Sequence, residues 1–283
     1  MKYIFATDFH GKQKKYNVFF QEIIKNAPDG VFLGGDLLPL KPPKNMTMEE
    51  FIEKHIFDKI RECKKNCKNR IKFFLIMGND DPRIYEKVFK KAHNDGLIEY
   101  VNEKTVRHNG LYITGYSFVP PTPFRLKDWE KYDVSRHVDV GAISPEEGKR
   151  TVSISSDKKR YSTIKKDLEK ISQNSPLDKT IFLFHSPPYQ TYLDRADLDG
   201  KKVDHAPVDV HVGSIAIKRF IKKKQPLLTL HGHVHESTDM TGRWKQRIGD
   251  AFSFNGACKK SKACFIMFDT DDIKDAKRVE KAL

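Results

Sequence analysis

The sequence predicts an α/β fold, in which short apolar strands alternate with amphipathic helices. The strongest strand signals are the apolar runs KYIFATD (2–8), GVFLGGD (30–36) and IKFFLIMGNDD (71–81), each of which ends in acidic or amide residues. The segments between these runs carry apolar residues at helical spacing. Because continuously apolar strands are typical of covered sheets, we expect helices to pack on the faces of the sheet.

Helix signals lie between and after these three strands. The first predicted helix has an apolar stripe made of Tyr16, Phe19, Phe20, Ile23 and Ile24. Thr47 and Glu50 form a capping-box pattern in front of the next helix, which carries Phe51 to Ile60. Asp81 and Pro82 are typical of a third helix start, followed by an apolar stripe of Ile84, Val88 and Ala92.

The second half of the chain continues with strands. EYVNEKTVRH (99–108) and GLYITGYSF (110–118) lack an intervening helix, which favours a hairpin. TIFLFHSPP (180–188) and PLLTLHGHVHES (226–237) are two further strands with polar ends, and a helix is expected between them at 214–223. AFSFNG (251–256) and ACFIMFD (263–269) are the last predicted strands, and we expect a charged helical end after them.

The length favours one large domain. A chain of 283 residues lies near the upper size for a single domain, and the sequence shows no repeats and no linker. We therefore expect one domain over 1–283, with an irregular insertion or cap at about 117–180. Within this segment only Ile164, Leu168 and Ile171 indicate a helix, because the remainder is rich in proline and polar residues.

The composition excludes several classes of protein. Four cysteines in so long a chain do not make a disulfide framework. Cys63 and Cys67 continue the stripe of Ile52, Ile56 and Ile60, so we interpret them as part of a buried helix face. The longest apolar runs are too short to cross a bilayer. Asp8 interrupts the N-terminal apolar run, which is therefore too short for the apolar region of a secretory signal. We expect a cytoplasmic protein without a membrane span.

The formal net charge of +14 raises the question of a nucleic-acid partner. The lysines are spread along the whole chain with acidic residues among them, which is more typical of solvated faces than of a binding groove. A basic surface that attracts anionic ligands remains the alternative. The charge does not name a substrate, and the sequence carries no signal for the oligomeric state.

Possible metal ligands follow the predicted strands. Asp8 and His10 stand at i and i+2, so on an extended chain both side chains reach one point beyond the strand. The full set at strand ends is Asp8, His10, Asp36, Asn79, His185, His233 and His235. Mixed oxygen and imidazole ligands favour Mn, Fe, Zn or Co. Seven ligands are more than one tetrahedral ion can bind. They would suit two ions about 3.5–4 Å apart that share a carboxylate.

These motifs resemble those of the calcineurin-like metallophosphoesterases. The motifs are D-x-H (8–10), GGD (34–36), GND (78–80), the isolated His185 and GHVH (232–235), in this order over most of the chain. The runs HSPPYQT, HVGS and GHVHES are similar to a predicted prokaryotic-type phosphoesterase subgroup. The resemblance implies a four-layer αββα sandwich with two mixed β-sheets flanked by helices.

The resemblance also implies a ligand assignment. One metal would be held by Asp8, His10, Asp36 and His235, and the other by Asp36, Asn79, His185 and His233, with Asp36 bridging them. The cations would bind phosphoryl oxygens and lower the pKa of a bridging water, which yields hydroxide for in-line attack on phosphorus. His231 is expected in the core or behind the ligands, whereas His55, His93, His108 and His137 match no motif.

One departure from the family concerns the leaving group. Many relatives have a histidine after the motif asparagine, whereas this chain has Asp80, which is a poor proton donor beside two cations. Asp80 either takes another catalytic part or caps the following helix. The ester could have a leaving group acidic enough to depart unaided, or His211 or His205 could supply the proton.

The second departure lies in the late loop FNGA, where relatives commonly have a proline between the asparagine and the glycine. We still expect this loop to turn toward the site. The candidate catalytic residues are therefore Asp80 and His211, and the candidate substrate-binding residues are Asn79, His205 and Asn255.

The sequence predicts a dinuclear-metal-dependent phosphoesterase that hydrolyses a small phosphomonoester or phosphodiester. A nuclease of the same fold is the first alternative, although the basic residues do not cluster as a DNA groove would require. A non-catalytic metal-binding scaffold is the second alternative. Members of this fold that act as scaffolds have typically lost ligands, whereas this chain retains all seven.

Overall fold

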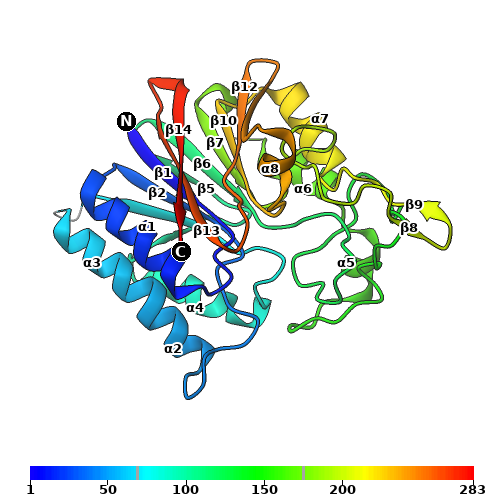
Figure 1. The fold of residues 1–283 in the computed structure, drawn as a ribbon, viewed down its shortest axis with the longest axis horizontal. Helices are drawn as coiled ribbons and strands as arrows, with labels where there is room; N and C mark the ends of the chain where they lie inside the picture. Colours follow the sequence, from blue (N-terminus) through cyan, green and yellow to red (C-terminus); the bar gives the residue numbers. More distant parts are fainter. Residues whose placement is uncertain (68–69, 174–175) are drawn as a thin grey trace.

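Two mixed six-stranded β-sheets form the centre of the computed structural model, which describes residues 1–67, 70–173 and 176–283 (Figure 1). The first sheet has the order β14-β13-β1-β2-β3-β4. Its strands are β1 (Lys2–Ala6), β2 (Gly30–Gly34), β3 (Lys72–Ile76), β4 (Glu99–Tyr100), β13 (Lys262–Asp269) and β14 (Asp272–Ala282). β1 to β4 are parallel, whereas β13 and β14 add an antiparallel hairpin beside β1.

The second sheet has the order β11-β12-β10-β7-β6-β5. Its strands are β5 (Thr105–His108), β6 (Leu111–Tyr116), β7 (Thr180–Phe184), β10 (Leu228–His231), β11 (Lys245–Ile248) and β12 (Ala251–Asn255). The four central strands are parallel, and β5 and β11 pair antiparallel at the two edges. The expected hairpin therefore joins β5 and β6, while EYVN contributes β4 to the first sheet.

The alternation of side chains along each strand builds two hydrophobic layers. Phe5 and Phe32 of the first sheet belong to the same buried cluster as Leu183 and Leu230 of the second, so this cluster fills the space between the sheets. The neighbouring Ile4 instead belongs to the cluster formed with the helices. The structure thus confirms the fold that the sequence predicts, two mixed sheets flanked by helices.

Helices cover the outer face of the first sheet (Figure 1). They are α1 (Gln13–Asn26), the continuous run α2 (Met48–Ile52), η1 (Glu53–Phe57) and α3 (Asp58–Asn66), and the pair η2 (Arg83–Tyr85) and α4 (Glu86–Asn94). The predicted capping box is present, because Thr47 accepts from the Glu50 amide and Glu50 accepts from the Thr47 amide. Cys63 is buried and Cys67 half-buried, in agreement with a packed helix face.

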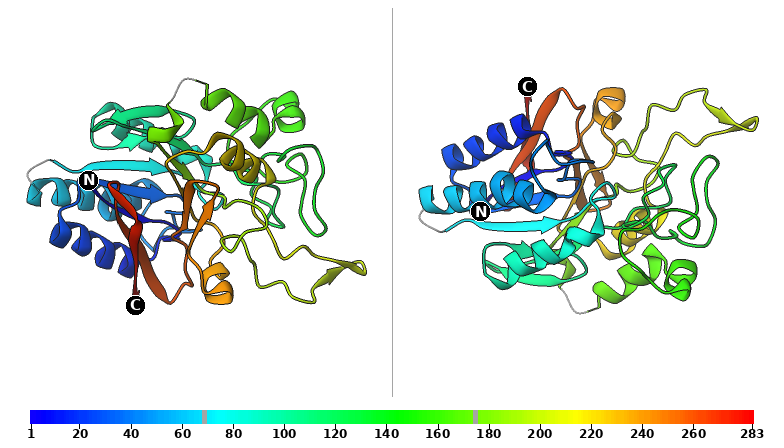
Figure 2. Two further views of the ribbon diagram at one scale, coloured as in Figure 1. Left: turned by 90° about the horizontal axis from the view of Figure 1, so that it is seen from above. Right: turned by 90° about the horizontal axis from the view of Figure 1, so that it is seen from below.

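The second sheet has its own helices, α6 (Ile164–Ile171) and α7 (Ile215–Lys224), with the short α8 (Ser237–Thr241) and η3 (Leu177–Lys179) nearby. α6 matches the helix that Ile164, Leu168 and Ile171 predicted. The small β8 (Lys202–Val203) and β9 (Ala206–Pro207) hairpin projects away from the body (Figure 2). None of the helices in the described ranges combines the length and apolarity that a bilayer crossing requires.

The largely irregular segment at 117–180 contains one helix that the sequence did not indicate, α5 (Ser156–Tyr161). The segment contains a buried ion pair, in which Lys127 Nζ lies 2.6 Å from Glu130 Oε2 and both side chains are fully buried. Asp133 accepts from the Ile215 amide (2.7 Å) and so caps α7. Through Asp133, the described part of this segment is attached to helix α7 beside the second sheet.

The C-terminal end corrects one expectation. The sequence indicated a charged helical end after ACFIMFD, but residues Asp272–Ala282 form strand β14. Ile273 and Ala276 of this strand are buried, whereas most of its other side chains are partly or fully exposed. Pairing with β13 along its length satisfies the backbone on one side, so tertiary pairing overrides the helical composition.

Candidate metal centre

The loops after strands of both sheets meet at one edge of the sandwich. The Asp8 amide donates to the Gly35 carbonyl (3.0 Å) and the His10 amide donates to the Asp36 carbonyl (2.8 Å), so the D-x-H and GGD loops run side by side. The His233 amide donates to a carboxylate oxygen of Asp8 (3.1 Å), which ties the GHVH loop of the second sheet to the first. Residues more than two hundred positions apart thereby converge.

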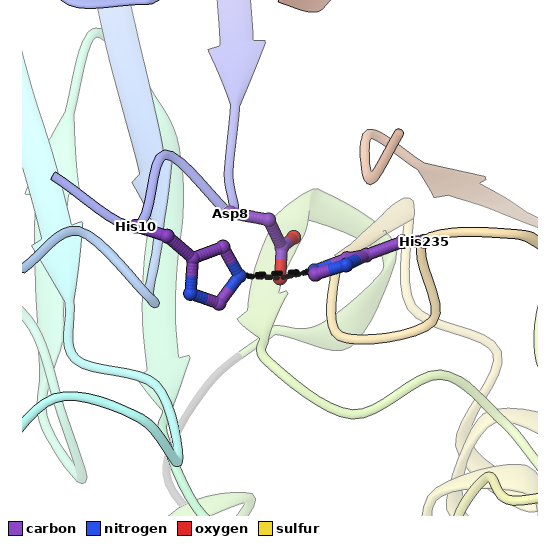
Figure 3. Close-up of side chains that lie close together, drawn as sticks. All are labelled: Asp8, His10 and His235. Atoms are coloured by element: carbon purple, nitrogen blue, oxygen red, sulfur yellow. Dashed lines mark hydrogen bonds and ion pairs between the residues drawn. The ribbon is translucent and has the colours of Figure 1, made fainter. Parts of the chain in front are cut away.

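The first group of side chains consists of Asp8, His10 and His235 (Figure 3). The Nε2 atoms of His10 and His235 lie 3.1 Å apart, and His235 Nε2 lies 3.1 Å from Asp8 Oδ1. His10 Nε2 lies 4.0 Å from the same oxygen. Two imidazole nitrogens and one carboxylate oxygen therefore point to one small volume, as Figure 3 shows.

The second group consists of Asp36, His185 and His233, whose candidate ligand atoms all lie within 4.8 Å of one another. Asn79 belongs beside them, because its Oδ1 lies 3.0 Å from His185 Nε2. His185 Nδ1 lies 2.8 Å from the Gly34 carbonyl, and this bond places the proton on Nδ1 and leaves the Nε2 lone pair facing the group. The second group thus contains one oxygen and two nitrogens, with an amide oxygen adjacent.

Asp36 lies between the two groups. Its Oδ2 is 3.4 Å from His185 Nε2 in the second group and 3.7 Å from His10 Nε2 in the first. Its Oδ1 accepts from the Asp80 amide (2.8 Å), which fixes the orientation of the carboxylate. A carboxylate in this position can be shared by both groups.

The backbone at this edge is unusual. Asp8, His10, Asp36 and His233 all have positive φ angles, between 47° and 72°, a region that non-glycine residues seldom occupy. Such strain of order 1–3 kcal/mol per residue is typical of functional sites and persists only where the surroundings enforce it. Here the strained backbone turns the four side chains toward one another.

Two glycines give the side chains room. A Cβ on Gly78 would collide with Asp36 Oδ1, and a Cβ on Gly232 would lie 2.6 Å from Asp8 Oδ2. Any larger residue at these positions would displace a carboxylate, in agreement with the close backbone approach that the sequence indicated.

The electrostatics of the centre fit cation binding. Burial opposes ionisation of Asp8, but the hydrogen bond from His235 and the nearby histidines lower its pKa well below the usual range. Burial lowers the pKa of His233 to about 4, which keeps its imidazole neutral. Burial also acts on His185, but the charge of Asp36 raises its pKa to about 10. A cation at Nε2 would take the place of that proton.

Two buried residues support the centre and were missed from the sequence. Asp81, interpreted as part of a helix start, accepts instead from the amides of Leu38 (2.7 Å) and Gly78 (2.9 Å), so it joins the GGD and GND loops. Lys15, only 1% exposed, donates from Nζ to the Asp8 carbonyl (3.0 Å). Lys15 lies four residues before Phe19 on the apolar stripe, and this spacing was the available signal.

Asp80 lies inside the centre, where its Oδ2 is 3.5 Å from His10 Nδ1 and its Oδ1 accepts from Asn79 Nδ2. Asp80 caps no helix, because η2 begins at Arg83 and has no side-chain cap. Burial, and then the charge of Asp36, raises the pKa of Asp80 to about 7.

The remaining candidates belong to neither of these two groups. His205 is exposed on the turn between β8 and β9. His211 is 27% exposed in the following loop, and its Nδ1 lies 2.9 Å from Asp194 Oδ1. Asn255 is fully buried at the end of β12, where its amide nitrogen donates to the Leu193 carbonyl (2.8 Å) and to Ser237 Oγ (2.8 Å). These bonds give Asn255 a part in holding loops together.

His231 is buried in the core behind the centre, as the sequence indicated. Its ring stacks on Phe184, with the ring centroids 5.6 Å apart. Nδ1 lies 2.8 Å from the Ser186 carbonyl, and Nε2 lies 2.7 Å from Thr229 Oγ1.

The donor set fits divalent cations such as Mn, Fe, Zn or Co, because carboxylate, amide and imidazole groups converge in two adjoining groups. The fold is an α/β sandwich with a cluster of candidate metal ligands at one edge. The family model of the calcineurin-like phosphoesterases matches residues 1–237, and the chain belongs to this family.

Solved structures agree with the fold. One crystal structure superposes with a TM-score of 0.59 at 15% identity, over 99% of this chain and 98% of the other. The crystal structure of TT1561 of Thermus thermophilus superposes with a TM-score of 0.57 at 14% identity, again over 99% and 98%. No protein of curated function matches the sequence significantly.

Proposed function

We propose that this chain is a dinuclear-metal-dependent phosphoesterase that hydrolyses a small phosphomonoester or phosphodiester. The observation that carries the proposal is the position of Asp36 Oδ2, 3.7 Å from His10 Nε2 and 3.4 Å from His185 Nε2. A carboxylate between two imidazole groups can be shared by two cations held close together, which is the arrangement used for in-line displacement at phosphorus.

Each residue has a defined part in this proposal. The first cation would be held by Asp8, His10, Asp36 and His235, and the second by Asp36, Asn79, His185 and His233. When bound, the cations supply Lewis-acid polarisation of the phosphoryl group and lower the pKa of a water molecule. The chain itself orients the ligands, through the Gly34 carbonyl at His185 and the Asp80 amide at Asp36.

The protein environment favours chemistry of this kind. Asp8, Asp36 and His185 are buried, so the ligands are shielded from bulk water and their interactions with cations are stronger than at an exposed site. The side chain of His10 is 14% exposed and that of His235 22%, which leaves the first group open toward solvent and substrate. We propose manganese as the physiological metal and the cytoplasm as the compartment.

The test measures metal and turnover together. The purified protein, loaded with Mn²⁺, should contain two metal ions per chain and should hydrolyse p-nitrophenyl phosphate or bis-p-nitrophenyl phosphate. Asp36→Asn should lose both the metal and the activity, whereas Asp250→Asn, at a side chain that is 95% exposed, should retain them. Bound metal without turnover of either ester would favour a non-catalytic scaffold. Salt-sensitive cleavage of single-stranded DNA in place of small esters would favour a nuclease.

A further inference from the structure

His211 and Asp194 form an ordered pair outside the metal centre. Nδ1 of His211 lies 2.9 Å from Oδ1 of Asp194, whose side chain is fully buried. Because a carboxylate oxygen accepts, this contact places a proton on Nδ1 and directs the other nitrogen, Nε2, away from Asp194. The His211 side chain is 27% exposed, so one edge of its ring faces solvent.

Asp194 is held rigidly by the backbone around it. Its carboxylate accepts from the amides of Gln190 (2.9 Å), Thr191 (2.8 Å) and Gly213 (3.1 Å). A carboxylate with this many donors cannot rotate without breaking several hydrogen bonds, so the imidazole that it contacts is also fixed. The arrangement has the form in which a carboxylate orients a histidine for proton transfer.

The loops that carry this pair are attached next to the candidate metal ligands of the second sheet. On one side the Ser214 amide donates to the Pro187 carbonyl (2.9 Å), and Pro187 lies two residues after His185. On the other side the Asp197 amide donates to Glu236 Oε1 (3.2 Å), and Glu236 directly follows His235.

A third attachment runs through Asn255, whose amide nitrogen donates to the Leu193 carbonyl (2.8 Å), next to Asp194. Loops anchored beside both His185 and His235 lie along the edge of the sandwich where the candidate metal ligands converge. These attachments place the loops that carry Asp194 and His211 beside the strand ends that bear His185 and His235.

We propose that His211 donates the proton to the leaving oxygen of the ester, and that Asp194 is the positioning residue that holds it for this step. The inference rests on the proposed function and gives it a proton donor. It also assigns a substrate class, esters whose alkoxide leaving group needs protonation. Asp80, at the place where relatives have a histidine, lies inside the candidate metal centre between His10 and Asn79.

The step balances as a hydrolysis. As the oxygen of water bonds to phosphorus, the bond from phosphorus to the leaving oxygen breaks and its electron pair stays on that oxygen. The leaving oxygen takes the proton from His211 Nε2 and departs as an alcohol. A proton released by the attacking water restores His211, so no oxidant, reductant or further reactant is consumed.

The other groups around His211 are also defined. The Asp209 carboxylate accepts from the His211 amide (2.8 Å) and from the Tyr189 hydroxyl (2.6 Å). The Tyr189 ring lies edge-on to the imidazole with centroids 6.1 Å apart, and Arg195 pairs with His211 through the backbone. The carboxylates of Asp194 and Asp209 thus contact His211 at its ring and at its backbone amide.

The test compares esters whose leaving groups differ in acidity, with the metal-loaded protein. His211→Gln should lower kcat by about 100-fold on an alkyl phosphate and by less than about threefold on p-nitrophenyl phosphate, because a nitrophenolate departs without a proton. In His211→Gln, the decrease of kcat at high pH should disappear with the alkyl ester and should remain unchanged with the aryl ester. His137→Gln, at a side chain that is 77% exposed, is the matched control and should leave both rates unchanged.

A second measurement tests the part of Asp194 without turnover. In ¹⁵N-histidine spectra of the intact protein, His211 should show a proton on Nδ1, and Asp194→Asn should weaken that signal and lower kcat on the alkyl ester more than on the aryl ester. Equal losses on both esters in His211→Gln, or an unchanged His211 signal in Asp194→Asn, would overturn the inference while the proposed function stands. If the metal-loaded wild type hydrolyses neither ester, the proposed function fails, and the inference fails with it.

Discussion

The ammonium group of Lys15 donates a hydrogen bond to the backbone carbonyl of Asp8, with 3.0 Å between Nζ and O. Lys15 is 1% exposed on the buried face of α1, so this helix brings a positive charge directly behind the D-x-H loop. Asp8 has a φ of 59° and its carbonyl would otherwise lose a partner in the interior. The bond holds the strained loop in the conformation that points the Asp8 carboxylate at His235.

Lys15→Met should therefore weaken metal binding. Loss of this support is expected to lower Mn²⁺ affinity by about 10–100-fold, as for other residues that orient metal ligands. Isothermal titration with Mn²⁺ measures the change, and circular dichroism checks that the fold is retained. Lys14→Met, at the exposed neighbouring position, is the control. Unchanged affinity in a folded Lys15→Met protein would contradict this role.

The shared position of Asp36 predicts a difference in metal stoichiometry between variants. Asp36→Asn should reduce bound metal from two ions to fewer than one, because both groups lose their common oxygen. His235→Ala should lose only the ion of the first group, since His235 contacts Asp8 and His10. Elemental analysis after dialysis distinguishes the two variants, and the same metal content in both would argue against a bridging carboxylate.

The buried His231 predicts that stability falls in mild acid. Burial lowers the pKa of His231 from 6.5 to about 3, so below about pH 6.5 the unfolded chain binds a proton that the folded protein does not. Between pH 7 and pH 5 this difference should cost about 2 kcal/mol of unfolding free energy. Urea unfolding at both pH values should show a smaller decrease in His231→Gln, which cannot titrate there. An equal decrease in the two proteins would rule out this source.

The strand-end motifs were readable from the sequence because ligand chemistry imposes residue types at fixed spacing. Asp8 with His10 and the GHVH run needed only the rule that strand ends meet at one edge of the sheet. Lys15 was harder to recognise, because a lysine beside other lysines has the composition of an exposed face and only its place on the stripe indicates burial. The tail at 272–282 has no apolar alternation strong enough to indicate a strand, and its pairing with β13 determines its structure.

The structure of the segment at 117–180 could not be predicted from the sequence, for a different reason. Its order depends on pairs such as Lys127 with Glu130, and Trp129 Nε1 donating to the Asp81 carbonyl (2.8 Å). Contacts of this kind join residues without any periodic pattern, so the sequence around them resembles that of a surface loop. The same limit applies to Asp194, whose partners are mostly backbone amides.

Removal of metal should destabilise the protein, because cations that bind only the folded form add to its stability. At a free Mn²⁺ concentration 100 times the dissociation constant, one site contributes about 2.7 kcal/mol. EDTA should therefore lower the melting temperature of the wild type measured by calorimetry. Asp36→Asn should show a much smaller change with EDTA, and an equal change in both proteins would contradict binding at this centre.

The two groups described above take side chains from loops of both sheets. Asp8, His10 and Asp36 follow strands of the first sheet, whereas His185, His233 and His235 follow strands of the second. Ions bound at this centre would therefore link the two sheets to each other. Phe5 and Leu230, in the hydrophobic layer between the sheets, set the spacing of the two sheets. A change in the volume of either side chain would alter the distance between ligands that come from different sheets. The rate of hydrolysis should therefore respond to mutations that are remote from the reacting phosphate.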